Sequence, residues 1–183
     1  MADGQPTNAM DAHATLPIEA PPEAPPLPVE VVLDTNVVLD WLVFDDAAMR
    51  PVGRLIESCT WRWVLSPVMR DEIADVLGRP AITARVGDQA GLLRRIASLG
   101  QLVAEPTPVN SADLVCADPD DQPFIDLAVA RAVPLLLTRD KALLALTLSA
   151  GRIGVRVLTP ADYASSHGAL NFNPARPAQT RVR

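Results

Sequence analysis

Residues 29–36 read Val-Glu-Val-Val-Leu-Asp-Thr-Asn, a short run of β-branched and apolar residues that ends in an acid. Such a run predicts a buried strand over Val29–Leu33, directly followed by Asp34. A second segment of this kind, Leu-Leu-Leu-Thr-Arg-Asp at 135–140, predicts another strand that leads into Asp140. If both strands belong to one parallel sheet, the two acids lie at its carboxyl edge, where such sheets bind ligands.

Strand and helix patterns alternate through the middle of the chain. Further strands are predicted over Trp61–Leu65, Gln101–Ala104, Pro134–Thr138 and Val155–Leu158, and helices over Val37–Phe44, Ala47–Ser58, Pro67–Leu77, Ala81–Val86, Asp88–Leu99, Gln122–Ala132, Lys141–Ser149 and Pro160–Ala164. Ser66 is expected to cap the helix that starts at Pro67. This alternation predicts an α/β fold, a parallel sheet with helices on both faces.

The composition indicates one folded domain with tails. Of the 183 residues, 49% are hydrophobic and 21% are charged, which is enough for a sizeable core. Residues 1–28 hold seven prolines and no Lys or Arg, so we expect a disordered leader. Residues 164–183 carry three Arg and no acid and are expected to be a disordered basic tail. The folded domain then spans 29–163.

The chain shows no membrane or export signal. Its apolar runs fall short of the ~18 residues that cross a bilayer, and its first residues lack the basic and apolar regions of a signal peptide. We therefore expect a cytoplasmic protein without membrane contact. The net charge of −6 is unusual for a nucleic-acid enzyme, but acids gathered around a metal would leave the remaining surface close to neutral.

Cysteine and histidine are too scarce for several classes of site. Cys59 and Cys116 are the only cysteines, and we expect both to be reduced core residues. His13 and His167 are the only histidines, and they lie in or near the tails. A structural zinc site and a histidine-based triad are therefore excluded, and the chemistry must come from carboxylates.

Glu72 is the acid of its helix that is expected to point inward. It borders the apolar stripe formed by Met69, Ile73, Val76 and Leu77. Asp71 and Asp75, on the other side of the same helix, should face water. Taken alone, Glu72 could equally be a solvated charge at the edge of a helix.

Three more acids, Asp118, Asp120 and Asp121, directly precede the helix predicted from Gln122. If it is a plain crossover, this helix is expected to begin at the amino edge of the sheet, away from the other acids, whereas the family resemblance given below argues otherwise. Each of the three alone could simply cap this helix. Asp126, in the middle of the helix, is expected at the surface or at a pocket rim.

A divalent cation would make a cluster of these acids tolerable. Several carboxylates in one pocket raise each other's pKa, and burial adds a desolvation cost. Mg²⁺ and Mn²⁺ prefer oxygen ligands, activate water and offset the charge on phosphate. The joint order and spacing of the acids carry this hypothesis, because each acid alone has an ordinary explanation.

Several segments, in this order, resemble a known family. Residues 31–37, Val-Val-Leu-Asp-Thr-Asn-Val, resemble the opening signature of PIN domains, and 65–77 resemble their second acidic motif. Residues 116–128 are similar to the Asp-Pro-Asp-Asp motif of one bacterial subgroup, 136–144 to the last motif and 158–163 to the closing segment. The resemblance covers about 29–163. It implies a three-layer α/β/α PIN-like domain around a central, mostly parallel sheet of four or five strands.

The resemblance also implies a site. The catalytic residues and ligands of Mg²⁺ or Mn²⁺ would be Asp34, Glu72, Asp121 and Asp140; Asn36 and Thr138 would order the pocket, and Asp118 or Asp120 would be neighbours or alternative ligands. Arg139 and Lys141 are close enough in sequence to help hold an RNA phosphate. Gln122 and Pro123 stand where many members of the subgroup carry an Asp and a Lys, which leaves the third ligand open among Asp118, Asp120 and Asp121.

The subgroup implied by the resemblance contains VapC-like ribonucleases, the toxin components of toxin–antitoxin pairs. The implied activity is metal-dependent cleavage of RNA, blocked by a protein antitoxin, and pairing of two or more chains is expected. A degenerate PIN domain that binds RNA or protein without cleavage is the main alternative. A haloacid-dehalogenase phosphatase needs a second Asp where this chain has Asn36, and a receiver domain would require a phosphorylation-dependent switch.

Overall fold

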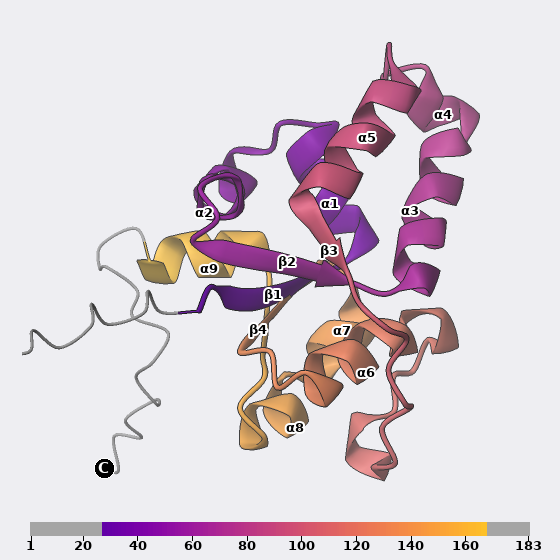
Figure 1. Ribbon diagram of the computed structural model, residues 1–183. Helices are drawn as coiled ribbons and strands as arrows, with labels where there is room; N and C mark the ends of the chain where they lie inside the picture. The colour runs from indigo at the N-terminus through magenta and orange to yellow at the C-terminus, as the bar shows by residue number, and fades with distance from the viewer. Residues whose placement is uncertain (1–26, 168–183) are drawn as a thin grey trace, which may run out of the picture.

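The computed structural model describes residues 27–167 (Figure 1). Within them, one sheet has the strand order β3-β2-β1-β4-β5, and every neighbouring pair is parallel. The strands are β1 Val29–Leu33, β2 Trp61–Leu65, β3 Gly100–Leu102, β4 Leu135–Leu137 and β5 Arg156–Leu158. The predicted strands are all present, and the expectation of a mostly parallel sheet is confirmed.

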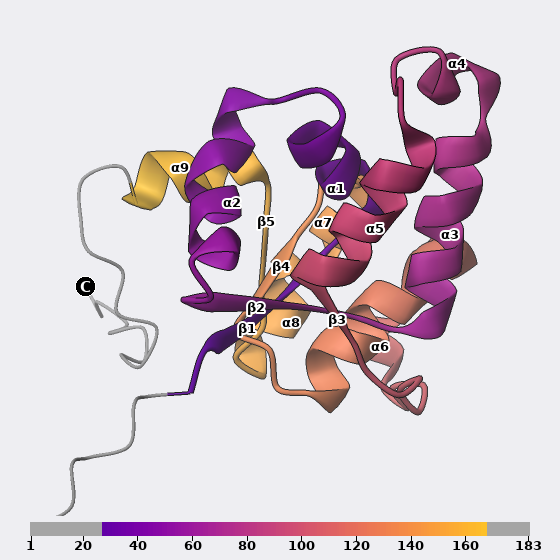
Figure 2. The ribbon, with the colours of Figure 1, turned by 45° about the horizontal axis from the view of Figure 1, so that its top comes forward.

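Helices cover both faces of this sheet. They are α1 Thr35–Leu42, α2 Arg50–Glu57, α3 Pro67–Gly78, α4 Pro80–Thr83, α5 Gln89–Leu99, α6 Gln122–Ala130, α7 Lys141–Ala145, α8 Thr147–Arg152 and α9 Pro160–His167, with 3-10 turns η1 Ala47–Met49, η2 Ala112–Leu114 and η3 Pro119–Asp121. Figures 1 and 2 show α1, α2, α3 and α5 on one face and α6, α7 and α8 on the other. The predicted three-layer α/β/α arrangement is therefore confirmed.

The element boundaries differ from the predicted ones in a few places. The helix expected over Ala47–Ser58 is a 3-10 turn followed by α2, and the one expected over Lys141–Ser149 is split into α7 and α8. The last helix ends at His167, past the expected domain end at 163. The expected disorder of the leader and of the basic tail falls almost wholly outside residues 27–167. No helix within that range is long and apolar enough to cross a bilayer.

The winding of the sheet reverses between its two central strands. The chain moves outward from β1 to β2 and β3, then crosses back to β4 and β5. In open α/β sheets the carboxyl end of such a reversal is where ligands bind. Leu33 and Leu137 are register partners at this point, and the Asp34 N–H donates to the Leu137 carbonyl at 3.0 Å. Asp34 and the segment leading to Asp140 therefore share the carboxyl edge, as predicted.

The expectation that the helix from Gln122 begins at the amino edge is wrong. The chain leaves β3 at the carboxyl edge and must enter β4 at the amino edge. A crossover helix therefore runs antiparallel to the strands and starts at the carboxyl edge. Asp121, the N-cap residue of α6, accordingly lies within electrostatic range of Asp34 and Asp140.

The hydrophobic core lies between the sheet and its helices. The central strands are buried on both sides, which explains their uninterrupted apolar sequence. Trp41 of α1 packs edge-on against Trp63 of β2, with ring centroids 6.3 Å apart. Gly53 of α2 sits against the indole of Trp41, because a Cβ there would lie 2.3 Å from Trp41 Nε1. This close approach fixes α1, the helix that starts at Asp34.

Two side chains, Cys59 and Ser66, differ from their predicted surroundings, whereas Cys116 lies in the core as predicted. Cys59 is exposed rather than in the core, Cys116 is buried, and neither forms a disulfide. Ser66 precedes α3 but does not cap it; its hydroxyl donates to Glu105 at 3.1 Å. Glu105 also accepts the Val68 N–H, at 3.4 Å, so a residue of the connection that follows β3 caps α3 in place of Ser66.

Asp126 is buried rather than at the surface. It is 5% exposed and accepts hydrogen bonds from the Val109 N–H, at 3.0 Å, and from Gln122 Nε2, at 2.8 Å. These two bonds satisfy a carboxylate that would otherwise be costly to bury. Asp126 thus ties the long connection between β3 and α6 to the helix itself.

Candidate functional site

Asp34 is the most buried of the predicted site acids, at 2% exposed. It is the N-cap of α1, and its Oδ1 accepts the Asn36 N–H at 3.4 Å. Its Oδ2 accepts the hydroxyl of Thr138 at 2.8 Å. Burial raises the pKa of Asp34, partly offset by these hydrogen bonds, and the charge of Asp140 raises it further. The side chain of Asn36 itself is exposed, so its contribution to the site is the backbone contact.

Thr138 connects two of the acids. Its hydroxyl is fully buried, donates to Asp34 and accepts the Asp140 N–H at 2.8 Å. Asp140 in turn caps α7 through Oδ1, which accepts the Ala142 N–H at 2.6 Å. One buried hydroxyl therefore fixes the end of β1 relative to the start of α7.

Asp121, the N-cap residue of α6, approaches Asp34 and Asp140. It is half-buried, and its pKa is raised to about 7 by burial, by the charges of Asp140 and Asp34, and by a hydrogen bond with Asp140. An ordinary exposed Asp titrates near 4. The charges of Asp34 and Asp140 thus oppose the ionisation of Asp121.

Glu72 reaches the same region from α3. It is half-buried, as expected, while Asp71 and Asp75 are exposed. Burial raises the pKa of Glu72, and the charge of Asp34 adds to the effect. The buried Thr35 hydroxyl interacts with this carboxylate but forms no hydrogen bond of normal geometry. The helical periodicity therefore oriented Glu72 correctly.

The segment before α6 separates the three neighbouring acids. Asp118 is exposed and caps η3 by accepting the Asp120 N–H at 3.0 Å. Asp120 is exposed too, and its charge reaches Glu72. Of the three, Asp121 is the one that the structure brings close to Asp34 and Asp140.

Gln122, which departs from the subgroup pattern, holds the loop that carries Asp118. Its Oε1 accepts the Cys116 N–H at 2.7 Å, and its Nε2 donates to the Leu114 carbonyl at 3.2 Å and to Asp126. Its amide both donates and accepts in this position, which a carboxylate could not do.

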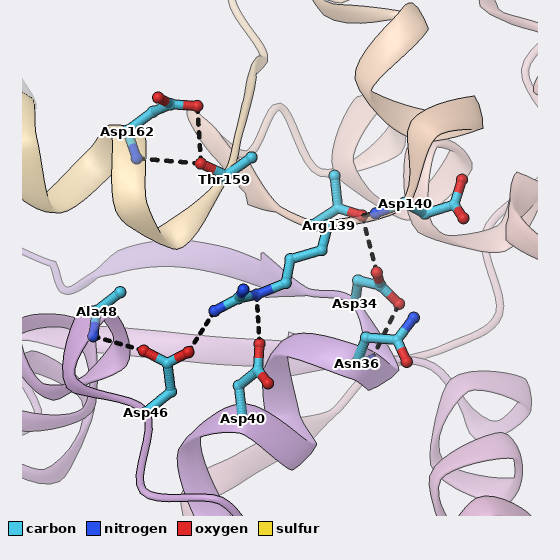
Figure 3. Close-up of polar contacts among 10 residues, drawn as sticks. Asp34, Asn36, Asp40, Asp46, Ala48, Arg139, Asp140, Thr159 and Asp162 are labelled. Carbon is cyan, nitrogen blue, oxygen red and sulfur yellow. Dashed lines mark hydrogen bonds and ion pairs between the residues drawn. The ribbon is translucent and has the colours of Figure 1, made fainter.

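Arg139 does not point toward the acids on either side of it in sequence. Figure 3 shows its side chain extending away from Asp140 toward Asp40 and Asp46. Arg139 Nε pairs with Asp40 Oδ2, and Nη2 pairs with Asp46 Oδ2, each at 2.5 Å. Lys141 is exposed at the first position of α7. Sequence reasoning did not single out Asp40 or Asp46.

The four predicted ligands suit a hard cation, since each offers carboxylate oxygens. In residues 27–167, however, no three Asp, Glu, His or Cys side chains stand together as a group that could hold a metal ion. The raised pKa values of Asp34 and Asp121 are the feature that fits a cation, because a divalent ion would offset the like charges that help to raise them.

A comparison with known protein families agrees with this fold. The sequence model of the PIN domain family matches residues 30–142, more than half of the chain. The chain therefore belongs to the PIN domain family. PIN domains are nucleases, and in general they use divalent metal ions.

No curated relative matches the chain in sequence. Among solved structures, the chain is similar to one in the crystal structure of VapBC2 from Rickettsia felis bound to a DNA fragment from its promoter. That match has a TM-score of 0.47 and 12% identity, and it covers 70% of this chain and 97% of the other.

Proposed function

We propose that this chain is an endoribonuclease that hydrolyses RNA phosphodiester bonds with Mg²⁺ or Mn²⁺ held by Asp34, Asp121 and Asp140, with Glu72 as a direct or water-mediated ligand. The observation that carries this proposal is the crowding of carboxyl groups at the winding reversal, where the pKa of Asp121 is raised to about 7. Family membership supports nuclease chemistry, and the oxygen-only donor set supports a hard cation.

When bound, the cation would supply water activation and charge stabilisation on the phosphate. The remaining work falls to the chain itself. Thr138 holds Asp34 through a hydrogen bond and presents the backbone N–H of Asp140 in a fixed position. Lys141, exposed beside Asp140, is proposed to contact the RNA backbone. Within residues 27–167 no three acids are close enough together to hold a metal ion. The side chains of Asp34, Asp121 and Asp140 would therefore have to rotate closer to one another when the cation binds.

In hydrolysis, water attacks the phosphorus, one P–O bond to ribose breaks, and the products are one phosphate-terminated and one hydroxyl-terminated strand. The test is cleavage of an end-labelled mixed RNA pool by the full-length chain, with Mg²⁺, with Mn²⁺ and with excess chelator. We expect cleavage only with metal, and its loss in Asp34→Asn and Asp140→Asn variants that remain folded. Full activity in chelator, or in either variant, would refute the proposed site.

The biological role proposed from the subgroup resemblance is that of a VapC-like toxin whose activity a protein antitoxin blocks, in a chain that pairs with a second copy in the cytoplasm. The segment Asp-Pro-Asp-Asp at 118–121 supports the subgroup. Induced expression in a bacterial host should arrest growth, and Asp34→Asn should relieve the arrest. An RNA-binding PIN domain without catalysis would instead bind the RNA pool and leave it intact in every metal condition.

A further inference from the structure

Three consecutive residues, Thr138, Arg139 and Asp140, connect β4 to α7; the Asp140 backbone is extended, and Figure 3 shows the Arg139 side chain extending away from Asp140. Successive side chains of an extended segment point to opposite sides. Thr138 and Asp140 therefore serve the acid cluster, whereas Arg139 is directed to the 40–46 region at the end of α1.

The guanidinium of Arg139 contacts two carboxylates at once. It pairs with Asp40 and Asp46, which are 18% and 30% exposed, while its own side chain is 44% exposed. Asp46 also donates its N–H to the Asp40 carbonyl at 2.8 Å and accepts the Ala48 N–H at 2.8 Å. The Asp46 carboxylate is thus fixed by the Ala48 N–H as well as by the arginine, and the Asp46 N–H ties its backbone to that of Asp40.

These contacts link the same two segments that carry the site. Asp34 begins α1 and Asp40 lies farther along that helix, while Thr138 and Arg139 precede Asp140. The turn before α7 is therefore attached to α1 twice, through Thr138 at Asp34 and through Arg139 at Asp40. Two attachments prevent the rotation of one segment against the other that a single hydrogen bond would allow.

We infer that Arg139 is a positioning residue: through Asp40 and Asp46 it sets the distance between the carboxylates of Asp34 and Asp140, and it is not free to bind the RNA phosphate. This inference rests on the proposed metal-dependent function. Removing the guanidinium of Arg139 should leave Asp34 and Asp140 in place but less rigidly positioned, so that metal affinity falls even without RNA.

The experiment measures Mn²⁺ affinity calorimetrically, and kcat and KM for RNA, in the full-length chain and in Arg139→Met, Asp46→Asn and the double variant. Loss of a residue that orients metal ligands typically weakens affinity 10–100-fold, so we expect each single variant to raise the Mn²⁺ Kd by about tenfold or more. The double variant should be no worse than Arg139→Met alone, because Arg139→Met already removes the ion pairs with both Asp40 and Asp46. Arg139→Lys should recover part of the lost affinity, since lysine keeps the positive charge but lacks the planar guanidinium that pairs with both carboxylates.

The matched control is Arg50→Met, which removes an exposed ion pair with Asp45 from the same region and should leave Mn²⁺ affinity unchanged. Thermal melts identify any variant that fails to fold, and Arg139→Lys then carries the comparison. Unchanged Mn²⁺ affinity in Arg139→Met, with a raised KM for RNA alone, would overturn the inference in favour of a phosphate contact. A wild-type chain that binds no Mn²⁺ would overturn the proposed function itself, and this inference with it.

Discussion

Replacing Asp121 with Asn should stabilise the metal-free protein while removing its metal site. In the folded chain, Asp121 ionises against burial and against the charges of Asp140 and Asp34, which raise its pKa from 3.8 to about 7. The folded state therefore binds this proton more tightly than the unfolded state does. The resulting stability is fully present below about pH 4 and is lost as the pH rises through about 7. Asparagine cannot ionise, so the variant escapes this loss.

The magnitude follows from the size of the shift. About three pKa units correspond to about 4 kcal/mol, but Asp121 is only partly buried, so solvent screening reduces the expected gain to about 1–2 kcal/mol at pH 8. For a chain of this size, that gain is about 2–8 °C in melting temperature. The difference between variant and wild type should shrink toward zero near pH 4.

The assay is thermal unfolding of both proteins in excess chelator across this pH range. Asp113→Asn is the matched control, since Asp113 is an exposed acid of the same connection and its replacement should change nothing. Adding Mn²⁺ should reverse the order, because binding stabilises the wild type by about 2.7 kcal/mol at one hundred times its Kd. An Asp121→Asn variant that melts below wild type at pH 8 in chelator would refute the crowding of carboxylates on which the site depends.

Three further substitutions test the surrounding structure by thermal melts in chelator. Thr138→Val keeps the shape but leaves a buried oxygen of Asp34 without its donor, and should cost about 1–3 kcal/mol; an unchanged melting temperature would contradict that hydrogen bond. Asp126→Ala removes the acceptor of the Val109 N–H and of one N–H of the Gln122 side-chain amide, and should cost about 1–3 kcal/mol. An unchanged melting temperature would contradict the burial of Asp126. Gly53→Ala forces a methyl group against Trp41 and should cost about 1–3 kcal/mol by overpacking; a stabilised variant would show that the indole moves freely.

The strand ends could be predicted from sequence because their signal is local. Two apolar runs that each lead to an acid predicted that Asp34 and Asp140 lie at one edge of the sheet. The helical spacing predicted that Glu72 points inward. The family resemblance included Asp121 among the site acids, whereas the expectation from strand topology put the start of its helix at the wrong edge of the sheet. A helix that joins two parallel strands must begin at the carboxyl edge, so the general rule already placed Asp121 beside the other two acids.

The burial of Asp126 and the direction of the Arg139 side chain were harder to predict from sequence patterns. An acid inside a helix is usually solvated, and the partner of Asp126 at Val109 lies in a distant loop. The Gln122–Asp126 spacing was a usable sign, because residues four apart on a helix are neighbours. For Arg139, alternation along extended backbone could have indicated that it points away from Asp140. Its two carboxylate partners, Asp40 of α1 and Asp46 of the turn that follows it, are brought to Arg139 only by the fold.

The most direct measurement of the central claim is anomalous diffraction from crystals of the full-length chain soaked in MnCl₂. The account predicts one strong peak enclosed by Asp34, Asp121 and Asp140, with Glu72 in direct or water-mediated contact, and its disappearance in crystals of Asp34→Asn. A peak bound elsewhere, or none at a saturating concentration, would contradict it.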